Sequence, residues 1–218
     1  MSKGIVVCLC DITGHFAEPW VEFGYSALLV DPQHTDTGEG PWFKFPGTIE
    51  DAMPVIDLLI QADAISFVMG FPPCTDVAVS GARWWEEKRL ADPYFQARAA
   101  IVAQQCKTIG QLSGAPWAFE NPVSAFSSIF GAPNYSFDPF NYAALCHEDQ
   151  YTKQTCLWTG GGFKMPVPRE IGSVGMPDDR IFKAPPSEDR ANFRSATPRG
   201  FARACFLANA PEFKGKGY

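Results

Sequence analysis

Five short apolar runs along the chain predict buried β-strands. Each run is rich in β-branched or aromatic residues, is too short for a helix, and ends close to a turn or an acidic residue. Continuous apolar runs of this kind are typical of a parallel sheet that is covered on both faces. The runs occupy residues 4–10, 25–31, 64–70, 115–120 and 154–160.

Amphipathic segments between these runs predict helices. The longest, residues 93–113, has apolar side chains three or four positions apart, which places them on one face of a helix. These side chains are Phe95, Ala99, Val102, Cys106, Ile109 and Leu112. Shorter helices are expected over residues 18–24, 48–62 and 197–209. Thr48 and Thr197 are the expected N-caps of the last two.

Strands that alternate with helices predict an α/β fold with a mostly parallel, doubly wound sheet, as in Rossmann-like proteins. We expect a single domain over residues 1–218, with loops at 32–47 and 161–193. Sheets of this kind bind ligands at the carboxyl ends of their strands. Four polar side chains lie at or just past predicted strand ends and should gather at one edge of the sheet: Asp11, Asp31, Cys74 and Glu120.

Composition and charge narrow the class of protein. Of the 218 residues, 46% are hydrophobic and 19% charged, which is typical of a globular chain. No apolar run is long enough for a membrane span. Seven irregularly spaced cysteines argue against a disulfide framework, and without a Cys-x-x-Cys pair they argue against a metal site; they favour a reducing cytoplasm. The net charge of -6 argues against strong nonspecific binding to DNA.

The charge is unevenly distributed. Residues 1–150 hold 7 Lys and Arg against 18 Asp and Glu, whereas residues 151–218 hold 11 against 6. A polyanion would therefore meet the C-terminal part. Arg194, Arg199 and Arg203 form a basic group there, which either contacts backbone phosphates or is a solvated helix face.

Cys74 is the principal candidate for chemistry. It follows Pro72 and Pro73, which restrict the backbone and prevent a helix from beginning there, so the thiol lies on a stiff turn after a buried strand. A nucleophilic cysteine needs donors or positive charge nearby to lower its pKa, and Arg83 is a candidate for this role. The alternative is a structural thiol that fills a small apolar gap.

Glu120 is the second candidate. It follows the apolar stretch Trp-Ala-Phe and precedes Asn121 and Pro122. A carboxylate in this place either binds the N–H edge of a heterocycle or accepts backbone N–H groups in a turn.

The segment after the first predicted strand has features of a cofactor site. Thr13 and Gly14 predict a tight turn that brings backbone N–H groups to a ligand. Asp31 ends the second strand, 20 residues after Asp11, where an acid commonly accepts hydrogen bonds from ribose hydroxyls. The spacing favours a cofactor that contains a nucleoside.

In this order, the motifs resemble those of cytosine-C5 DNA methyltransferases, and most closely those of small phage-type members of that family. The similar stretches are DITGHFAEPWVEFGY, FPPCTDVAVSGARWW, FENPVS, YTKQTCLWTG and RSATPRGFARACFLAN. The resemblance implies a Rossmann-like methyltransferase fold without a large target-recognition domain, in whose place the loop-rich insertion 161–193 stands. It also implies a location in the cytoplasm of a host cell.

The resemblance further implies S-adenosylmethionine as cofactor and DNA as substrate. The Cys74 thiolate would attack C6 of a cytosine, Glu120 would bind the N3/N4 edge of the base, and Lys153 would be the basic residue of the site. The implied cofactor contacts are Asp11, Thr13, Gly14, Phe16, Asp31 and Pro72. The implied substrate contacts are Asn121, Arg83, Trp84 and Ser80; for Trp84 and its neighbour Trp85, core packing is the alternative.

The chain also departs from typical family members. Ile12 and His15 stand where such members carry glycines, and Lys153 and Gln154 stand where they carry an Arg-rich motif. The missing recognition domain implies loose sequence specificity, a single-stranded or free-nucleotide substrate, or a partner protein that supplies recognition. Two rival functions are a non-catalytic binding protein on a methyltransferase scaffold and a cysteine hydrolase, which would need His15 or His147 beside Cys74.

Overall fold

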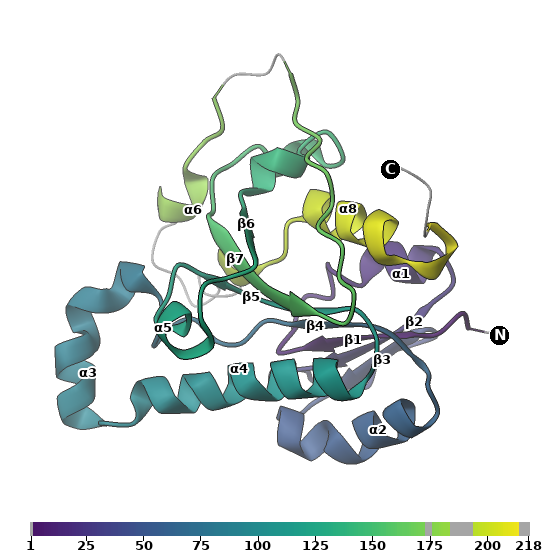
Figure 1. Ribbon diagram of the computed structural model, residues 1–218, viewed down its shortest axis with the longest axis horizontal. Helices are drawn as coiled ribbons and strands as arrows, with labels where there is room; N and C mark the ends of the chain where they lie inside the picture. Colours follow the sequence, from purple (N-terminus) through teal and green to yellow (C-terminus); the bar gives the residue numbers. More distant parts are fainter. Residues whose placement is uncertain (1, 173–175, 184–193, 214–218) are drawn as a thin grey trace.

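The protein is built on a seven-stranded sheet of order β3-β2-β1-β4-β5-β7-β6 (Figure 1). The computed structural model describes residues 2–172, 176–183 and 194–213. The strands are β1 (Ile5–Leu9), β2 (Ser26–Val30), β3 (Trp42–Phe45), β4 (Ile65–Gly70), β5 (Trp117–Pro122), β6 (Tyr135–Phe137) and β7 (Thr155–Gly160). The first five pair in parallel, whereas β7 runs antiparallel to both β5 and β6. The α/β class and the mostly parallel sheet, which is compatible with a Rossmann-like fold, are confirmed.

Helices cover both faces of the sheet, as the continuous apolar strands predict. Alternate residues of β1 enter two separate cores, because successive side chains of a strand point to opposite faces. On one face, Val6 packs with α1 (Glu18–Glu22) and α8 (Arg199–Asn209) in a core rich in aromatic rings. On the other, Val7 packs with α2 (Ile49–Gln61) and α4 (Phe95–Leu112). Figure 1 shows α1 and α8 above the sheet and α2 and α4 below it.

The two predicted helix caps differ in outcome. Thr48 caps α2 in a reciprocal arrangement: its Oγ1 accepts the Asp51 amide at 3.2 Å, and the Asp51 carboxylate accepts the Thr48 amide at 3.0 Å. The prediction for Thr197 is wrong. The N-cap of α8 is Pro198, which has no side chain to cap the helix, and the buried amide of Gly200 donates instead to Asp149 Oδ2 at 2.6 Å. Asp149 belongs to the turn η3 (His147–Asp149), so this cap is supplied from a distant part of the chain.

The inward face of α4 differs from the prediction in its later turns. Phe95, Ala99, Cys106 and Ile109 are buried as expected, but Leu112 is 59% exposed, and Ala103 is buried in place of Val102. The predicted spacing is shorter than the 3.6 residues of a helical turn, so its later members rotate away from the sheet.

Several elements carry no sequence pattern that predicts them. β3 lies inside the segment 32–47, which was expected to be a loop, because this edge strand has no fully buried residue and hence no apolar run. The other missed elements are η1 (Val79–Trp84), α3 (Trp85–Ala91), α5 (Phe126–Phe130), β6 and the short turns after it.

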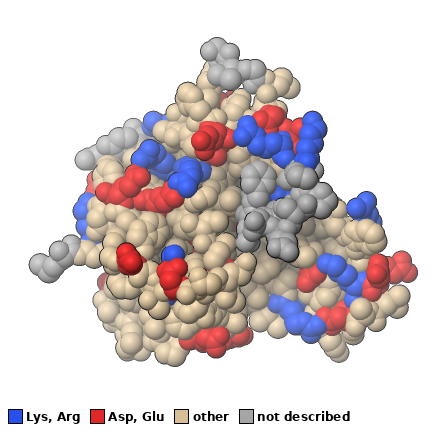
Figure 2. Space-filling model, turned by 180° about the vertical axis from the view of Figure 1, so that it is seen from behind, with Lys and Arg blue, Asp and Glu red and all other residues tan. Residues whose placement is uncertain are grey.

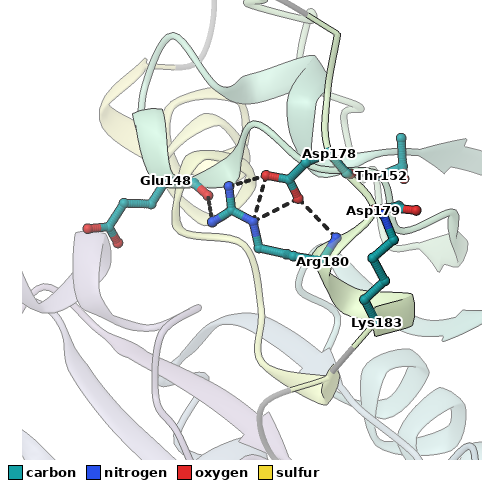
Figure 3. Close-up of polar contacts among 6 residues, drawn as sticks. All are labelled: Glu148, Thr152, Asp178, Asp179, Arg180 and Lys183. Carbon is teal, nitrogen blue, oxygen red and sulfur yellow. Dashed lines mark hydrogen bonds and ion pairs between the residues drawn. The ribbon is translucent and has the colours of Figure 1, made fainter. Parts of the chain in front are cut away.

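The described part of the insertion 161–193 is mostly loop, with one short helix, α6 (Arg180–Lys183). Asp178 forms a parallel bridge with Tyr151, and its carbonyl oxygen accepts the Thr152 amide at 2.8 Å. Figure 3 shows the side chains around this bridge: Arg180 binds the Asp178 carboxylate and reaches the Glu148 carbonyl oxygen at 3.5 Å. The insertion is therefore fastened to the segment that leads into β7. Among the described residues, no helix is both long and apolar enough to cross a bilayer.

Candidate active site

Cys74 lies four residues beyond the carboxyl end of β4. In the sheet, β4 itself lies between β1 and β5. Phe71 continues the pairing, since its amide donates to the Leu9 carbonyl oxygen at 2.8 Å. The carbonyl oxygen of Cys74 accepts the amides of Val77 and Ala78 at 3.1 and 2.9 Å, which turns the chain sharply after the proline pair. The thiol is half-buried.

The Cys74 loop is joined to the segment that follows Glu120. Asn121 Nδ2 donates to the Pro72 carbonyl oxygen at 2.9 Å. Further along, the Val79 amide donates to the Val123 carbonyl oxygen at 2.9 Å, and the Ala125 amide donates to that of Val77 at 2.9 Å. The Asn121 side chain is 1% exposed and fixes the position of the loop through this bond, whereas its predicted contact with the substrate stays a prediction.

The Glu120 carboxylate lies close enough to the Cys74 thiol to affect its ionisation. Burial raises the pKa of the Cys74 thiol, and the nearby Glu120 carboxylate raises it further, whereas Lys153 and Arg194 lower it. Burial also raises the pKa of Glu120, against the opposing effect of Lys153. Glu120 Oε2 is enclosed and has no hydrogen-bond partner among the described residues. This oxygen therefore does not accept backbone N–H groups in a turn, which was the structural alternative for Glu120.

Lys153 joins this cluster from the other side. It precedes β7, and its ammonium group donates to the Ala196 carbonyl oxygen at 3.3 Å. Its amide donates to Asp138 Oδ1 at 2.7 Å, which fixes the backbone at this point. The structure thus brings together the three predicted catalytic residues, and it adds Arg194, to which the sequence analysis gave a different role.

The predicted cofactor turn is present but is built differently from the expectation. Asp11 Oδ1 accepts the amides of Thr13 and Gly14, both at 2.9 Å, and the Thr13 hydroxyl at 3.0 Å. The two amides that were expected to face a ligand are therefore used within the turn. Gly14 has φ +71°, and a Cβ there would lie 3.0 Å from Leu29 Cδ1, so both the backbone conformation and the close packing favour glycine.

The Asp11 carboxyl also lies beside the buried Cys8 thiol, whose pKa it raises in addition to the larger effect of burial. Burial raises the pKa of the Asp11 carboxyl itself, although the hydrogen bonds from Gly14 and Thr13 lower it, and its Oδ2 is enclosed with no partner among the described residues. Asp31 directly follows β2, and its Oδ1 accepts the Gln33 amide at 2.8 Å. His34, which the sequence analysis did not single out, links the two strand ends through a hydrogen bond of 3.0 Å between its Nε2 and the Asp11 carbonyl oxygen.

Carboxyl groups with an unsatisfied oxygen fit a ligand that brings N–H or O–H donors. An ammonium group and ribose hydroxyls, both present in S-adenosylmethionine, are such donors. Phe16 is fully enclosed, with its ring centroid 5.4 Å from that of Phe67, so it belongs to the core. Pro72 is buried as well. Phe16 therefore packs in the core, and its predicted contact with a cofactor stays a prediction.

No protein-family model and no curated protein matches the chain. The interpretation of the site therefore rests on its own residues.

The remaining predicted substrate residues lie on an exposed arm formed by η1 and α3. Ser80 and Arg83 are exposed, and Trp84 is 50% exposed, so core packing is excluded for Trp84. The Arg83 guanidinium lies 5.0 Å from the centroid of the Trp84 ring. Lys88 of α3 donates to Asp76 at 2.6 Å, which ties the arm to the Cys74 loop.

The predicted basic group in the C-terminal part is divided. Arg199 pairs with Glu18, and Arg203 pairs with Glu22 at 2.7 Å, so two of the three arginines join α8 to α1 and do not present a free basic surface. Figure 2 shows the same mixture, with Lys and Arg beside Asp and Glu over that face. Arg194 belongs to neither of these two ion pairs, and its positive charge lowers the pKa of the Cys74 thiol against the larger effect of burial.

Proposed function

We propose that the protein is an S-adenosylmethionine-dependent methyltransferase that modifies C5 of cytosine through a covalent adduct at Cys74. The observation that carries the proposal is the shared environment of Cys74 and Glu120 at the carboxyl edge of the sheet. The segment that carries Cys74 and the segment that carries Glu120 hydrogen-bond to each other, which keeps the sulfur and the carboxyl group near one another. This pair suits a ring that must be attacked at one atom and protonated at another.

Glu120 determines the first step. Because burial favours its neutral form, the carboxyl can donate a proton towards N3 of the pyrimidine as the Cys74 thiolate forms a bond to C6. The electron pair of the C5–C6 double bond is thereby made available at C5. Glu120 stabilises the negative charge that develops on the ring, and Lys153 keeps the surroundings of the thiolate positive.

When bound, S-adenosylmethionine would supply the methyl group that C5 receives and would leave as S-adenosylhomocysteine. Water then removes the C5 proton, the C5–C6 double bond re-forms as the bond between C6 and the Cys74 sulfur breaks, and the N3 proton returns to Glu120. The carboxyl of Asp11, with its enclosed and unpartnered oxygen, and that of Asp31 would hold the donor groups of the cofactor.

The substrate is a cytosine that can leave a base stack easily. Extracting a base from a duplex costs a few kcal/mol, which recognition contacts normally offset. The exposed pair Arg83 and Trp84 offers a positive charge and a ring face beside the Cys74 loop, which suits single-stranded nucleic acid. We therefore propose single-stranded DNA or a free cytosine nucleotide, or duplex DNA with the help of a partner protein.

One observation favours a second candidate, a non-catalytic binding protein on the same scaffold. The turn amides that could meet a cofactor are already bonded to Asp11. Calorimetry with S-adenosylmethionine distinguishes the two functions. Binding in the micromolar range supports the enzyme, and no binding supports the scaffold.

The decisive experiment is trapping with DNA that contains 5-fluorocytosine, in the presence of S-adenosylmethionine. The fluorine cannot leave as a proton does, so the adduct with Cys74 persists and is detected by mass. We expect an adduct in the wild type and in Cys146→Ser, a matched control outside the cluster, and none in Cys74→Ser. The same series is run with duplex DNA, single-stranded DNA and dCMP as acceptors of labelled methyl groups. No label on any acceptor, with an active control enzyme, contradicts the proposed function.

A further inference from the structure

A cavity of about 540 Å³ lies at the edge of the sheet opposite to the candidate active site. Its walls come from four segments: the last turns of α4, the start of β5, the loop after α5 and the end of β7. Trp117 and Gly160, which pair at one end of the β5–β7 ladder, both line it, whereas Glu120 lies further along β5 towards the other end. Small-molecule sites have volumes of about 300–1,000 Å³, so the cavity is large enough for a ligand.

Three aromatic rings line the cavity, those of Trp117, Phe130 and Trp158. The Trp117 indole lies against Gly110 and Gly160, where an added Cβ would be 2.4 and 2.5 Å from it. Trp117 and Trp158 are both buried, so their rings are fixed parts of the wall. Fixed aromatic rings offer an apolar surface that needs no rearrangement on binding, and they favour a planar aromatic ligand.

The charge in the cavity is positive. Among the described residues that line it, Lys107 is the one charged residue, and no carboxylate in the described part of the chain pairs with its ammonium group. This group lies 5.9 Å from the centroid of the Phe130 ring. Asn134 Oδ1 accepts the Thr159 amide at 2.8 Å, which leaves Asn134 Nδ2 as a donor. Because no acidic residue opposes Lys107 there, the cavity favours a ligand with a negative charge.

We propose that this cavity binds a small planar aromatic anion, with its ring against the aromatic wall and its negative group at Lys107. A free aromatic carboxylic acid and a nucleoside monophosphate share this chemistry. The inference goes beyond the proposed methyl transfer and does not depend on it, because none of Cys74, Glu120 and Lys153 lines the cavity.

The test is isothermal titration calorimetry of the full chain with naphthalene-2-carboxylate, which has two fused rings and one negative charge. We expect a Kd of roughly 20 µM to 1 mM, as for a ligand of this size. Two matched probes separate the contributions of ring and charge. Naphthalene-2-carboxamide keeps the rings without the charge, and cyclohexanecarboxylate keeps the charge without an aromatic ring. Each should bind at least roughly fivefold more weakly.

Two variants locate the binding in this cavity. Lys107→Gln should weaken binding of naphthalene-2-carboxylate roughly tenfold, since a hydrogen bond between charged groups is lost, and should leave binding of the carboxamide unchanged. Ala132→Phe adds a ring from an exposed position of the wall and should abolish binding of both probes. The control Lys44→Gln removes a lysine from β3, at the other edge of the sheet, and should change neither affinity.

Three results overturn the proposal. The first is the absence of binding to the wild type with a Kd below about 1 mM. The second is equal affinity for the carboxylate and the carboxamide. The third is an unchanged affinity for the carboxylate in folded Lys107→Gln. Should Lys107→Gln fail to fold, an unchanged affinity in Ala132→Phe overturns the proposal in its place.

Adenosine monophosphate is titrated in parallel and distinguishes the two sources of the ligand. Binding of this nucleotide that Lys107→Gln weakens supports the proposal and identifies a nucleotide as the ligand class. Binding of naphthalene-2-carboxylate without such nucleotide binding supports the proposal and identifies a free aromatic acid. Both results are obtained whether or not the chain transfers methyl groups, so they are independent of the outcome for the proposed function.

Discussion

The side-chain amide of Asn121 donates to the carbonyl oxygen of Pro72 at 2.9 Å and so joins two segments that are 49 residues apart in the chain. One segment carries Cys74 two residues after its contact, and the other carries Glu120 one residue before. The distance between the candidate nucleophile and the candidate acid thus depends on a buried side-chain amide.

Asn121→Ala should therefore reduce both stability and activity. The substitution leaves the Pro72 carbonyl oxygen without its donor, at a cost of about 1–3 kcal/mol in the free energy of unfolding. A displaced Cys74 loop should lower methyl transfer roughly 100-fold. Urea unfolding and transfer of labelled methyl groups measure the two effects. Asn134→Ala is the control, because the bond that Asn134 makes to the Thr159 amide is exposed. Equal costs in the two variants would contradict the role given to Asn121.

Glu120→Gln should move the reactivity of Cys74 and the activity in opposite directions. The negative charge of Glu120 raises the pKa of the Cys74 thiol, so removing this charge should lower that pKa. At a pH between the thiol pKa of the variant and that of the wild type, the variant should therefore be alkylated faster. Methyl transfer should nevertheless fall about 100-fold or more, because glutamine carries no acidic proton for the ring. Iodoacetamide labelling across a pH series gives the first quantity. Glu50→Gln, on the far face of the sheet, is the control, and a Cys74 profile that Glu120→Gln leaves unchanged would show that the two groups do not interact.

Asp149 should be the residue that stabilises the start of α8. Asp149→Ala removes the acceptor of the Gly200 amide and should cost about 1–2 kcal/mol, as the loss of an N-cap does. The isosteric Thr197→Val removes the hydroxyl at the position that the sequence indicated and should cost less than about 0.5 kcal/mol. Thermal and urea unfolding of both variants provide the comparison. A larger effect of Thr197→Val would restore the sequence-based cap.

Gly14 should tolerate alanine less well than Gly114 does. Both glycines have positive φ, +71° and +66°, so both substitutions carry the backbone penalty of about 1 kcal/mol. Only at Gly14 does the new methyl group also meet Leu29 and Trp42, whereas nothing lies within 4 Å at Gly114. The difference between the two free energies of unfolding therefore isolates crowding at the candidate cofactor turn. Cofactor calorimetry on Gly14→Ala then tests whether this turn belongs to the binding site.

The sequence predicted those features that depend on burial along one segment. Apolar runs in the sequence predicted five strands: β1, β2, β4, β5 and β7. The predicted ends of β4 and β5 gave the positions of Cys74 and Glu120 in the fold. The direction of β7 could not be predicted, since periodicity is the same in both directions of a strand. The edge strand β3 has no buried residue and so leaves no apolar signal.

Two kinds of side-chain contact were the main source of error within the site: a carboxylate bonded to the backbone of its own turn, and ion pairs between distant segments. Thr13 and Gly14 have the composition of a ligand-binding turn, and only the structure reveals that Asp11 occupies their amides. Arg194, Arg199 and Arg203 appear equivalent in the sequence, but two of them have partners on α1, 181 residues away in the case of Arg203 and Glu22. Sequence spacing carries no information on such pairings.

Because β7 runs antiparallel to β5, the two ends of this strand pair have different roles. An antiparallel strand begins at the edge where its parallel neighbours end, so Lys153, two residues before β7, lies near the carboxyl end of β5 although β7 follows β5 in the chain. At the opposite end of the same ladder, Gly160 and Gly110 both lie against the Trp117 indole, with no room for a side chain. Substitutions at the Trp117 end should therefore impair folding. Substitutions at the Lys153 end should change the reactivity of Cys74 in a protein that still folds.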